Sequence, residues 1–167
     1  MPDFYGTPAG FRAYHTARDH DVPAEALDDA TVSAWLLKAS EWIDGTYRGG
    51  FSGTKVGMRS QVREWPRNAA YDIYGYMIVQ ESVPSEVEYA TYEAALRHGT
   101  NLGSLLVDYT PGKYKAVSID GAVSATYAGF NSGADAQTQF LAIDQILFPI
   151  MTANGASSSL SGSVGRA

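Results

Sequence analysis

Residues 38–98 read KASEWIDGTYRGGFSGTKVGMRSQVREWPRNAAYDIYGYMIVQESVPSEVEYATYEAALRH, and this stretch decides the fold. It begins inside an aromatic, apolar segment that is stopped by the pair Gly49-Gly50. A segment rich in glycine and arginine then leads to Trp65-Pro66-Arg67. After Val83-Pro84 the chain turns alanine-rich. This order predicts two helices separated by one long insertion over residues 48–82.

The helix expected over residues 29–47 carries the widest apolar face in the chain. Asp28 or Asp29 can cap its first turn with a carboxylate. Its apolar side chains recur at helical spacing: Val32, Trp35, Leu36, Ala39, Trp42, Ile43 and Tyr47. We therefore expect this helix to organise the core.

Two more helices are expected on either side of that element. Thr7-Pro8 is typical of a helix start, because threonine can cap the first turn and proline loses no hydrogen bond there; we expect this helix over residues 7–19. Ser85 and Glu88 have the spacing of a capping box, which predicts a helix over residues 85–99. One face of that helix is built of small residues, which lets another helix approach closely: Val87, Ala90, Thr91, Ala94 and Ala95.

In the last third of the chain the spacing of apolar residues changes twice, first to that of a strand and then to that of a helix. Residues Lys113 to Tyr127 alternate as strands do around Asp120-Gly121, which predicts a β-hairpin. Asp135 to Met151 returns to helical spacing, and Pro149 is expected to kink or end that helix. The predicted fold class is therefore mainly α: a small helix bundle with a long inserted loop, one β-hairpin and a C-terminal helix.

Length and composition set the domain organisation. At 167 residues the chain can bury the core of one domain, which we place at residues 1–152, followed by a flexible Ser/Gly-rich tail at 153–167. No apolar run approaches the ~20 residues of a membrane span, so we expect none. There is no cysteine, hence no disulfide and no thiolate metal site. The N-terminus has no basic region followed by an apolar stretch, so we expect no secretion signal and synthesis in the cytoplasm.

The charge pattern bears on nucleic-acid binding. The net charge is −6, whereas a protein that grips DNA usually neutralises phosphates with a basic patch. Cations cluster only locally: Lys55, Arg59, Arg63, Arg67, Lys113 and Lys115. The overall sign disfavours DNA binding as the main activity, while the basic part of the insertion suits an acidic protein surface.

The histidines offer one candidate metal pair. His15 and His20 are five residues apart, with Asp19 or Asp21 as a further ligand, and His98 lies far away in the sequence. On a helix of ~3.6 residues per turn this spacing sets the two rings roughly 140° apart. The spacing therefore favours solvated histidines over a metal site.

Catalytic patterns are weak elsewhere. The carboxylate pairs are accounted for by capping and solvation, and Ser157 to Ser159 have no nearby base in the sequence. Residues 49–55 are glycine-rich but lack the spacing of a phosphate-binding loop. We therefore expect no catalytic residues, no cofactor and no metal, and predict that the protein is not an enzyme.

Trp65-Pro66-Arg67 has two interpretations. Trp65 can fill a gap between helices while Arg67 pairs locally with Glu64 or Asp72. Alternatively, Arg67 lies at a subunit contact, since tryptophan and arginine are enriched at interface hot spots. The two are compatible, and in both of them Trp65 is buried.

The ordered set of Trp42-Ile43-Asp44, Trp65-Pro66-Arg67 and Val83-Pro84 resembles the small head–tail connector, or adaptor, proteins of tailed bacteriophages. Some relatives in that family are described as DnaT-like ssDNA-binding. The resemblance covers about sixty residues well and two thirds of the chain loosely.

The resemblance implies a structural virion protein, made in the host cytoplasm. Copies would form a homo-oligomeric ring, typically of twelve, between the portal protein and a tail-side stopper or tail terminator protein. Genomic DNA would pass through the ring without specific binding. The C-terminal segment would dock on the portal, and the candidate interface residues are Arg59, Arg63, Trp65, Arg67, Phe140, Ile143, Leu147 and Ile150. The alternative is a single-stranded nucleic-acid-binding module.

Overall fold

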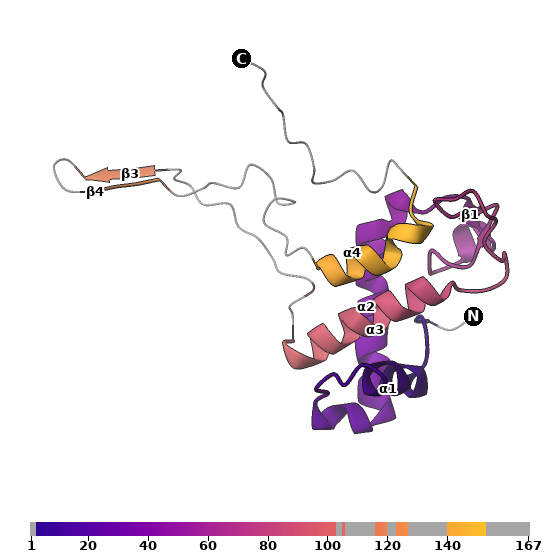
Figure 1. Cartoon of the computed structure of the whole chain (residues 1–167), viewed down its shortest axis with the longest axis horizontal. Coiled ribbons are helices and arrows are strands. Elements are labelled where there is room, and N and C mark those ends of the chain that lie inside the picture. The colour runs from indigo at the N-terminus through magenta and orange to yellow at the C-terminus, as the bar shows by residue number, and fades with distance from the viewer. Residues whose placement is uncertain (1–2, 103–104, 106–115, 120–122, 127–139, 153–167) are drawn as a thin grey trace, which may run out of the picture. The chain divides into compact units, whose positions relative to one another are not determined.

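The described part of the chain has four α-helices and two short antiparallel strand pairs (Figure 1). The mainly α fold class is as predicted, whereas the strand pair inside the insertion was not predicted. The structure, a computed structural model, describes residues 3–102, 105, 116–119, 123–126 and 140–152. It divides into two compact units, one of residues 1–105 with 140–167 and one of residues 106–139. No helix among the described residues is long and apolar enough to cross a membrane.

Helix α2, Asp29–Tyr47, is the centre of the first unit and has the predicted bounds. Asp28 caps it by accepting a hydrogen bond from the backbone N–H of Thr31 at 2.8 Å. Its predicted stripe is buried, with Val32, Leu36, Ala39 and Ile43 at 0% exposure. Helices α1 and α3 both pack against it.

Helix α3, Ser85–Thr100, crosses α2 (Figure 1). The predicted face of small residues lies at this contact, and Ala90, Ala94 and Ala95 are fully buried. The predicted capping box is wrong. Pro84 is the N-cap and Ser85 is already in the helix, so its hydroxyl contacts Glu86 instead of capping a backbone N–H.

Helix α1, Pro8–Thr16, starts where it was predicted but ends three residues early. Thr7 caps it by accepting from the N–H of Gly10 at 3.0 Å. Beyond Thr16 the chain turns at Asp19, whose φ is 52°. A 3-10 turn, η1 at Ala24–Leu27, then leads into α2.

The C-terminal helix is shorter than predicted in the described residues. Helix α4 spans Leu141–Leu147 and packs against α3, and a 3-10 turn, η4 at Phe148–Ile150, follows it. Pro149 lies in that turn, which agrees with its predicted role as a helix end. Residues 135–139 of the predicted helix lie outside the described residues.

The long insertion contains little regular structure, as predicted, but it is tied down at several points. It holds two 3-10 turns, η2 at Arg48–Gly50 and η3 at Met58–Ser60. Strands β1, Thr54–Lys55, and β2, Arg67–Asn68, pair antiparallel. Phe51 forms a bridge with Met151, and the N–H of Thr152 donates to the carbonyl of Gly50 at 2.7 Å. The insertion is thus joined to the chain that follows α4.

The second unit contains the predicted hairpin. Strand β3, Ala116–Ile119, pairs antiparallel with β4, Val123–Thr126, in the register Ile119 to Val123. This register brackets the predicted Asp120-Gly121 turn, which itself lies outside the described residues.

Candidate interaction surface and polar cluster

The carboxylate of Asp44 on α2 ties the insertion to the helix bundle. Its Oδ1 accepts a hydrogen bond from the hydroxyl of Tyr5 at 2.5 Å. Its Oδ2 lies 3.4 Å from the guanidinium of Arg63 and accepts from the N–H of Glu64 at 3.3 Å. The hydroxyl oxygen of Tyr5 accepts in turn from the N–H of Trp65 at 3.0 Å. Three segments that are distant in sequence therefore meet at one carboxylate.

Burial controls the protonation of this group. It raises the pKa of the Asp44 carboxyl, although the hydrogen bond from Tyr5 and the charge of Arg63 oppose that shift. Burial, helped by the nearby Asp44, also raises the pKa of the Tyr5 phenol. Tyr5 consequently keeps its proton and acts as a donor to Asp44.

Trp65 and Arg67 are both used inside the chain. Trp65 is 1% exposed, packs edge-on against Phe51 and precedes Pro66 through a cis peptide bond. Arg67 pairs with Glu64 at 2.8 Å and donates to the carbonyl oxygens of residues 52 and 53. The local interpretation of Arg67 is confirmed, with Glu64 rather than Asp72 as its partner, and the predicted burial of Trp65 is confirmed too.

Most of the predicted interface residues are buried within the chain. Arg59 is exposed and Phe140 is half-buried, while the others are buried: Arg63, Trp65, Arg67, Ile143, Leu147 and Ile150. These buried side chains are already covered by other parts of the same chain, so their burial requires no partner protein. That any of them contacts a neighbouring copy stays a prediction.

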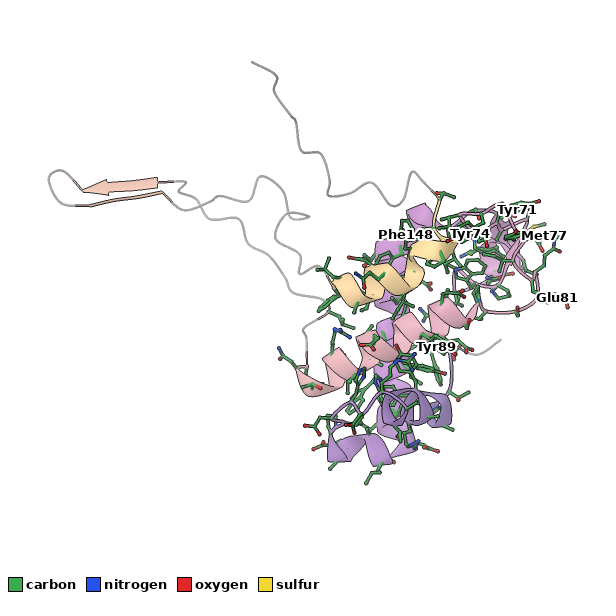
Figure 2. All side chains as sticks on the ribbon, in the orientation of Figure 1. Tyr71, Tyr74, Met77, Glu81, Tyr89 and Phe148 are labelled. Carbon is green, nitrogen blue, oxygen red and sulfur yellow. The ribbon has the colours of Figure 1, made fainter. Side chains whose placement is uncertain are left out.

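Seven of the exposed large apolar side chains come from the end of the insertion and from η4, whereas others, such as Leu27, Met58 and Val62, lie elsewhere in the chain. This set, here called the tyrosine patch, has exposures from 40% at Ile73 to 76% at Tyr74. Its members are Tyr71, Ile73, Tyr74, Tyr76, Met77, Val79 and Phe148. Figure 2 shows Tyr71, Tyr74 and Met77 projecting together from the loop. Six of the seven members lie within the nine positions 71–79, and this concentration is the sequence signal that could have identified the patch.

Hydrogen bonds made by backbone N–H groups, to a side chain and to another backbone segment, fix the loop that carries the patch. Asp72 Oδ1 accepts from the N–H groups of Tyr74 and Tyr76 at 2.9 and 2.8 Å. Gly75 takes the left-handed φ of 84° that this turn requires. The N–H of Ile73 donates to the carbonyl of Pro149 at 2.9 Å, which joins the loop to η4. The aromatic side chains therefore project from a backbone that is already ordered.

The two sequence stretches that form the patch contain no cation. From Asn68 to Leu96 the sequence has neither lysine nor arginine, and neither does the segment from Phe140 to Thr152. The acidic residues in these two stretches are Asp72, Glu81, Glu86, Glu88, Glu93 and Asp144. The patch is therefore aromatic and set in an acidic part of the chain.

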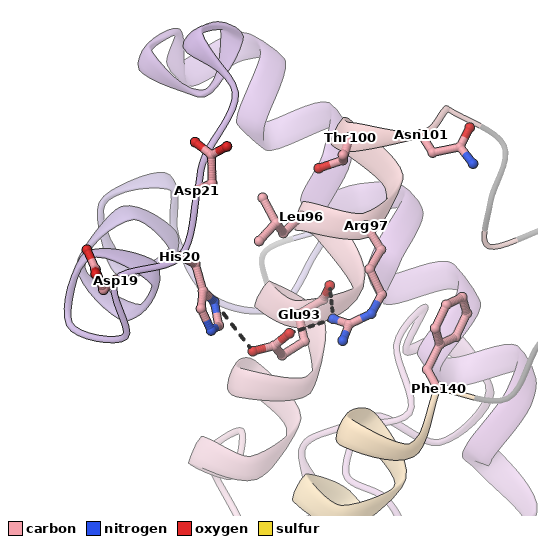
Figure 3. A pocket seen from close by; sticks show the side chains of 9 residues that line it. All are labelled: Asp19, His20, Asp21, Glu93, Leu96, Arg97, Thr100, Asn101 and Phe140. Atoms are coloured by element: carbon pink, nitrogen blue, oxygen red, sulfur yellow. Dashed lines mark hydrogen bonds and ion pairs between the residues drawn. The ribbon is translucent and has the colours of Figure 1, made fainter.

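A second polar cluster lies between the turn after α1 and helix α3. The Nδ1 atoms of His15 and His20 are 2.9 Å apart, and the His15 Nε2 is 3.1 Å from the carbonyl oxygen of Tyr92. Glu93 Oε1 lies 3.9 Å from His20 Nδ1 (Figure 3). The expectation of two separated histidine rings was wrong, because α1 ends at Thr16 and the following turn brings His20 back onto His15.

Glu93 is oriented from two sides. Arg97 donates to its Oε2 at 2.5 Å and Tyr14 donates to its Oε1 at 3.1 Å. Burial opposes its ionisation, but the hydrogen bond and charge of Arg97 outweigh that effect, so the pKa of Glu93 is lowered. Burial lowers the pKa of His15, which favours the neutral imidazole.

The cluster borders an open pocket of about 650 Å³. Its walls come from the turn after α1, from the second half of α3 and from Phe140 (Figure 3). The lining residues include Asp19, Asp21, Leu96, Thr100 and Asn101, besides His20, Glu93 and Arg97.

One comparison with known proteins gave a result. A family model described as "Putative DnaT-like ssDNA binding protein" matches residues 3–167. No curated protein and no solved structure was found to match the chain.

Proposed function

The chain belongs to this DnaT-like family, and from that premise we propose that it is a non-enzymatic structural subunit, the head–tail adaptor of a tailed bacteriophage. Copies would assemble into a ring of twelve between the portal and a tail-side stopper or tail terminator protein in the virion. The ring would leave a channel for DNA. The observation that supports this proposal best is the tyrosine patch, an ordered aromatic surface whose own sequence stretches contain no lysine or arginine.

Aromatic side chains can serve two kinds of partner. On proteins that bind single-stranded DNA they stack on bases, and they do so beside lysine and arginine that neutralise the phosphates. In protein interfaces tyrosine supplies a large contact area at a low cost in conformational entropy. The absence of lysine and arginine from Asn68 to Leu96 fits the second use.

The basic part of the insertion does not supply the missing charge. Lys55 and Arg67 both pair with Glu64, at 3.7 and 2.8 Å, and Arg63 pairs with Asp44. Of the six cations that the sequence analysis grouped, four lie in the insertion, and these three of the four are engaged inside the fold. Arg59 is the exposed one.

We assign the occupant of the patch as a second copy of this chain. Such a contact is heterologous, so it closes into a ring when the rotation between copies fits. A stable contact buries about 1,200–2,000 Å² in total, and seven large exposed side chains on one ordered loop and turn can nucleate an interface of that size.

The test removes apolar surface without touching the core. Light scattering or native mass spectrometry would measure the assembly state at rising concentration, alone and with the cognate portal protein. We expect rings from the wild type, and loss of rings from the double variant Tyr74→Ser, Tyr76→Ser. Leu27→Ser is the matched control, because Leu27 is 80% exposed but lies on η1, outside the patch. A wild type that stays monomeric even with the portal would overturn the adaptor proposal, and rings that survive in the double variant would remove the patch from it.

Binding of single-stranded DNA is the second candidate, because the family's description names it. Fluorescence anisotropy with a labelled oligonucleotide distinguishes the two functions. For an adaptor of net charge −6 we expect weak binding or none near physiological salt. Submicromolar binding that weakens steeply as salt rises would favour the second candidate.

A further inference from the structure

His15, His20 and Glu93 place three metal-ligating atoms within 4.8 Å of one another. They come from α1, from the turn after it and from α3, and they are the one such group of three among the described residues. The assembly role proposed above makes no use of this cluster, so the question is what else it can do.

The hydrogen bond of His15 fixes which ring nitrogen is free. The carbonyl oxygen of Tyr92 can only accept, so His15 Nε2 carries the hydrogen and donates to it at 3.1 Å. In the neutral ring the lone pair is then on Nδ1, which faces His20 Nδ1 at 2.9 Å. Two ring nitrogens at this distance need a proton or a metal cation between them.

The same hydrogen bond is a common feature of metal sites. A histidine that binds a metal usually donates its other ring N–H to a backbone carbonyl or a carboxylate, which fixes the tautomer and the ring orientation. Glu93 is held in the corresponding way, since Arg97 engages its Oε2 while Oε1 faces His20. Tyr14 adds a hydrogen bond to Oε1, which still has a lone pair to offer.

The two separations that involve His20 are close to those around a tetrahedral ion, and all three ligand atoms lie within 4.8 Å of one another. Zinc binds nitrogen and oxygen at about 2.0–2.2 Å, so its ligand atoms are separated by about 3.3–3.6 Å. The observed separations of 2.9 and 3.9 Å bracket that range. His20 and Glu93 also line the open pocket, which leaves room for water as a fourth ligand (Figure 3). The charge of Arg97 weakens the attraction for a cation, because its pair with Glu93 already offsets the charge of that carboxylate.

We propose that His15, His20 and Glu93 bind one divalent transition-metal ion of the zinc class, which clips the turn after α1 to helix α3. Two imidazoles and one carboxylate are borderline ligands that suit zinc better than calcium or magnesium, which prefer oxygen. The ion would replace the proton between the two histidines and fix the end of α1 on α3, with water from the pocket as its fourth ligand.

Metal binding is measured on the full chain, freed of any polyhistidine tag and stripped with a chelator. Isothermal titration with Zn²⁺ and the visible absorption of bound Co²⁺ are the two readouts. We expect one equivalent of Zn²⁺, a tetrahedral Co²⁺ spectrum and a melting temperature that rises with Zn²⁺.

The variants His20→Gln and Glu93→Gln remove one ligand each, and we expect each to weaken Zn²⁺ binding at least tenfold. His98→Gln is the matched control, because His98 lies on α3 outside the cluster, and it should bind like the wild type. His20 is partly exposed, so its replacement leaves the buried core untouched. A wild type that binds no more Zn²⁺ than His20→Gln, or a Co²⁺ spectrum typical of octahedral oxygen ligands, would overturn the proposal and leave a proton-bridged histidine pair.

Discussion

Asp44 shows how one side chain can organise a segment that has no regular structure. It is 6% exposed, and its two oxygens bind Tyr5 from the N-terminus and Arg63 with Glu64 from the insertion. These partners are distant from Asp44 in the sequence, since Tyr5 is 39 residues away and Arg63 is 19 residues away. Without the carboxylate, the buried guanidinium of Arg63 would keep only its hydrogen bond to the carbonyl of Asp3 and a long contact with Glu41.

We therefore predict that Asp44→Ala lowers the free energy of unfolding by about 3–5 kcal/mol, because it removes one partner of a buried ion pair. Glu41→Ala is the control. Glu41 contacts the same Arg63, but it is 42% exposed and 3.9 Å away, so its loss should cost about 0–1 kcal/mol. Urea denaturation followed by circular dichroism measures both variants. Equal effects of the two changes would contradict the central role given to Asp44.

Trp65 fills the space between the insertion and the bundle. We predict that Trp65→Ala lowers the free energy of unfolding by about 3–5 kcal/mol, as large-to-small changes in a core do. Tyr74→Ala removes another aromatic ring from the same insertion, but one that is 76% exposed, and it should change stability by no more than about 0.5 kcal/mol. Thermal and urea unfolding of the monomer provide the comparison. An unchanged melting temperature for Trp65→Ala would disprove its role in the core.

At the scale of the elements, two helical glycines have opposite surroundings. Gly99, near the end of α3, lies against Trp35 of α2, and a Cβ there would come within 2.6 Å of the ring. Gly45, near the end of α2, has nothing within 4 Å of the same position. The first glycine permits the close approach of two helices, whereas the second only weakens its own helix.

We predict that Gly99→Ala destabilises the fold by about 1–3 kcal/mol, because the added methyl group overpacks the contact between α2 and α3. Gly45→Ala should stabilise it by about 0.5–1 kcal/mol, because alanine reduces the conformational freedom of the unfolded chain. Both free energies come from the same urea titration. A stabilising Gly99→Ala would show that Trp35 can move aside at little cost.

The elements also show where sequence reasoning succeeds and where it stops. The bounds of α2 are predictable because Asp28 caps it and the apolar stripe runs along its whole length. The end of α1 is not, because it depends on the left-handed conformation of Asp19 and on the N–H of His20 bonding back to the carbonyl of His15. The histidine cluster was missed for the same reason, since a helix extended to residue 19 would separate the two rings.

The tyrosine patch illustrates a different limit. Local composition reveals the aromatic residues, but their exposure depends on tertiary hydrogen bonds from the loop to η4 and to Ser52. Conversely, the apolar stripe of the C-terminal helix is visible in the sequence, yet only the fold shows that Ile143 and Leu147 are fully buried in the chain's own core. Periodicity predicts which face is apolar; it does not say what covers that face.

At the scale of the whole molecule, the acidic balance and the ordered aromatic surface favour assembly with proteins over capture of DNA. In the proposed ring, an acidic channel would repel phosphates and let a genome pass without binding. Most lysines and arginines among the described residues form ion pairs within the chain, including Arg12 with Asp29 and Lys38 with Glu41. Among the described residues, Arg18, Arg48 and Arg59 are the cations outside these ion pairs.

The C-terminal end provides the last prediction. The described fold makes its final ties at Met151, which bridges Phe51, and at Thr152, which donates to Gly50. Residues 153–167, the predicted Ser/Gly-rich tail, lie outside the described residues and carry one charged side chain, Arg166. We predict that a chain ending at Thr152 keeps its free energy of unfolding within about 0.5 kcal/mol but attaches poorly to portal-bearing heads.

A chain ending at Phe148 is the control for that truncation. It also loses the segment that bonds to Gly50, Phe51 and Ile73, so it should be clearly less stable than the chain ending at Thr152. Urea titration separates the two truncations, and sedimentation with filled heads measures attachment. Normal attachment by the chain ending at Thr152 would refute a docking role for the tail. If that chain failed to fold, the tail would belong to the domain, because its loss would then remove contacts that the fold needs.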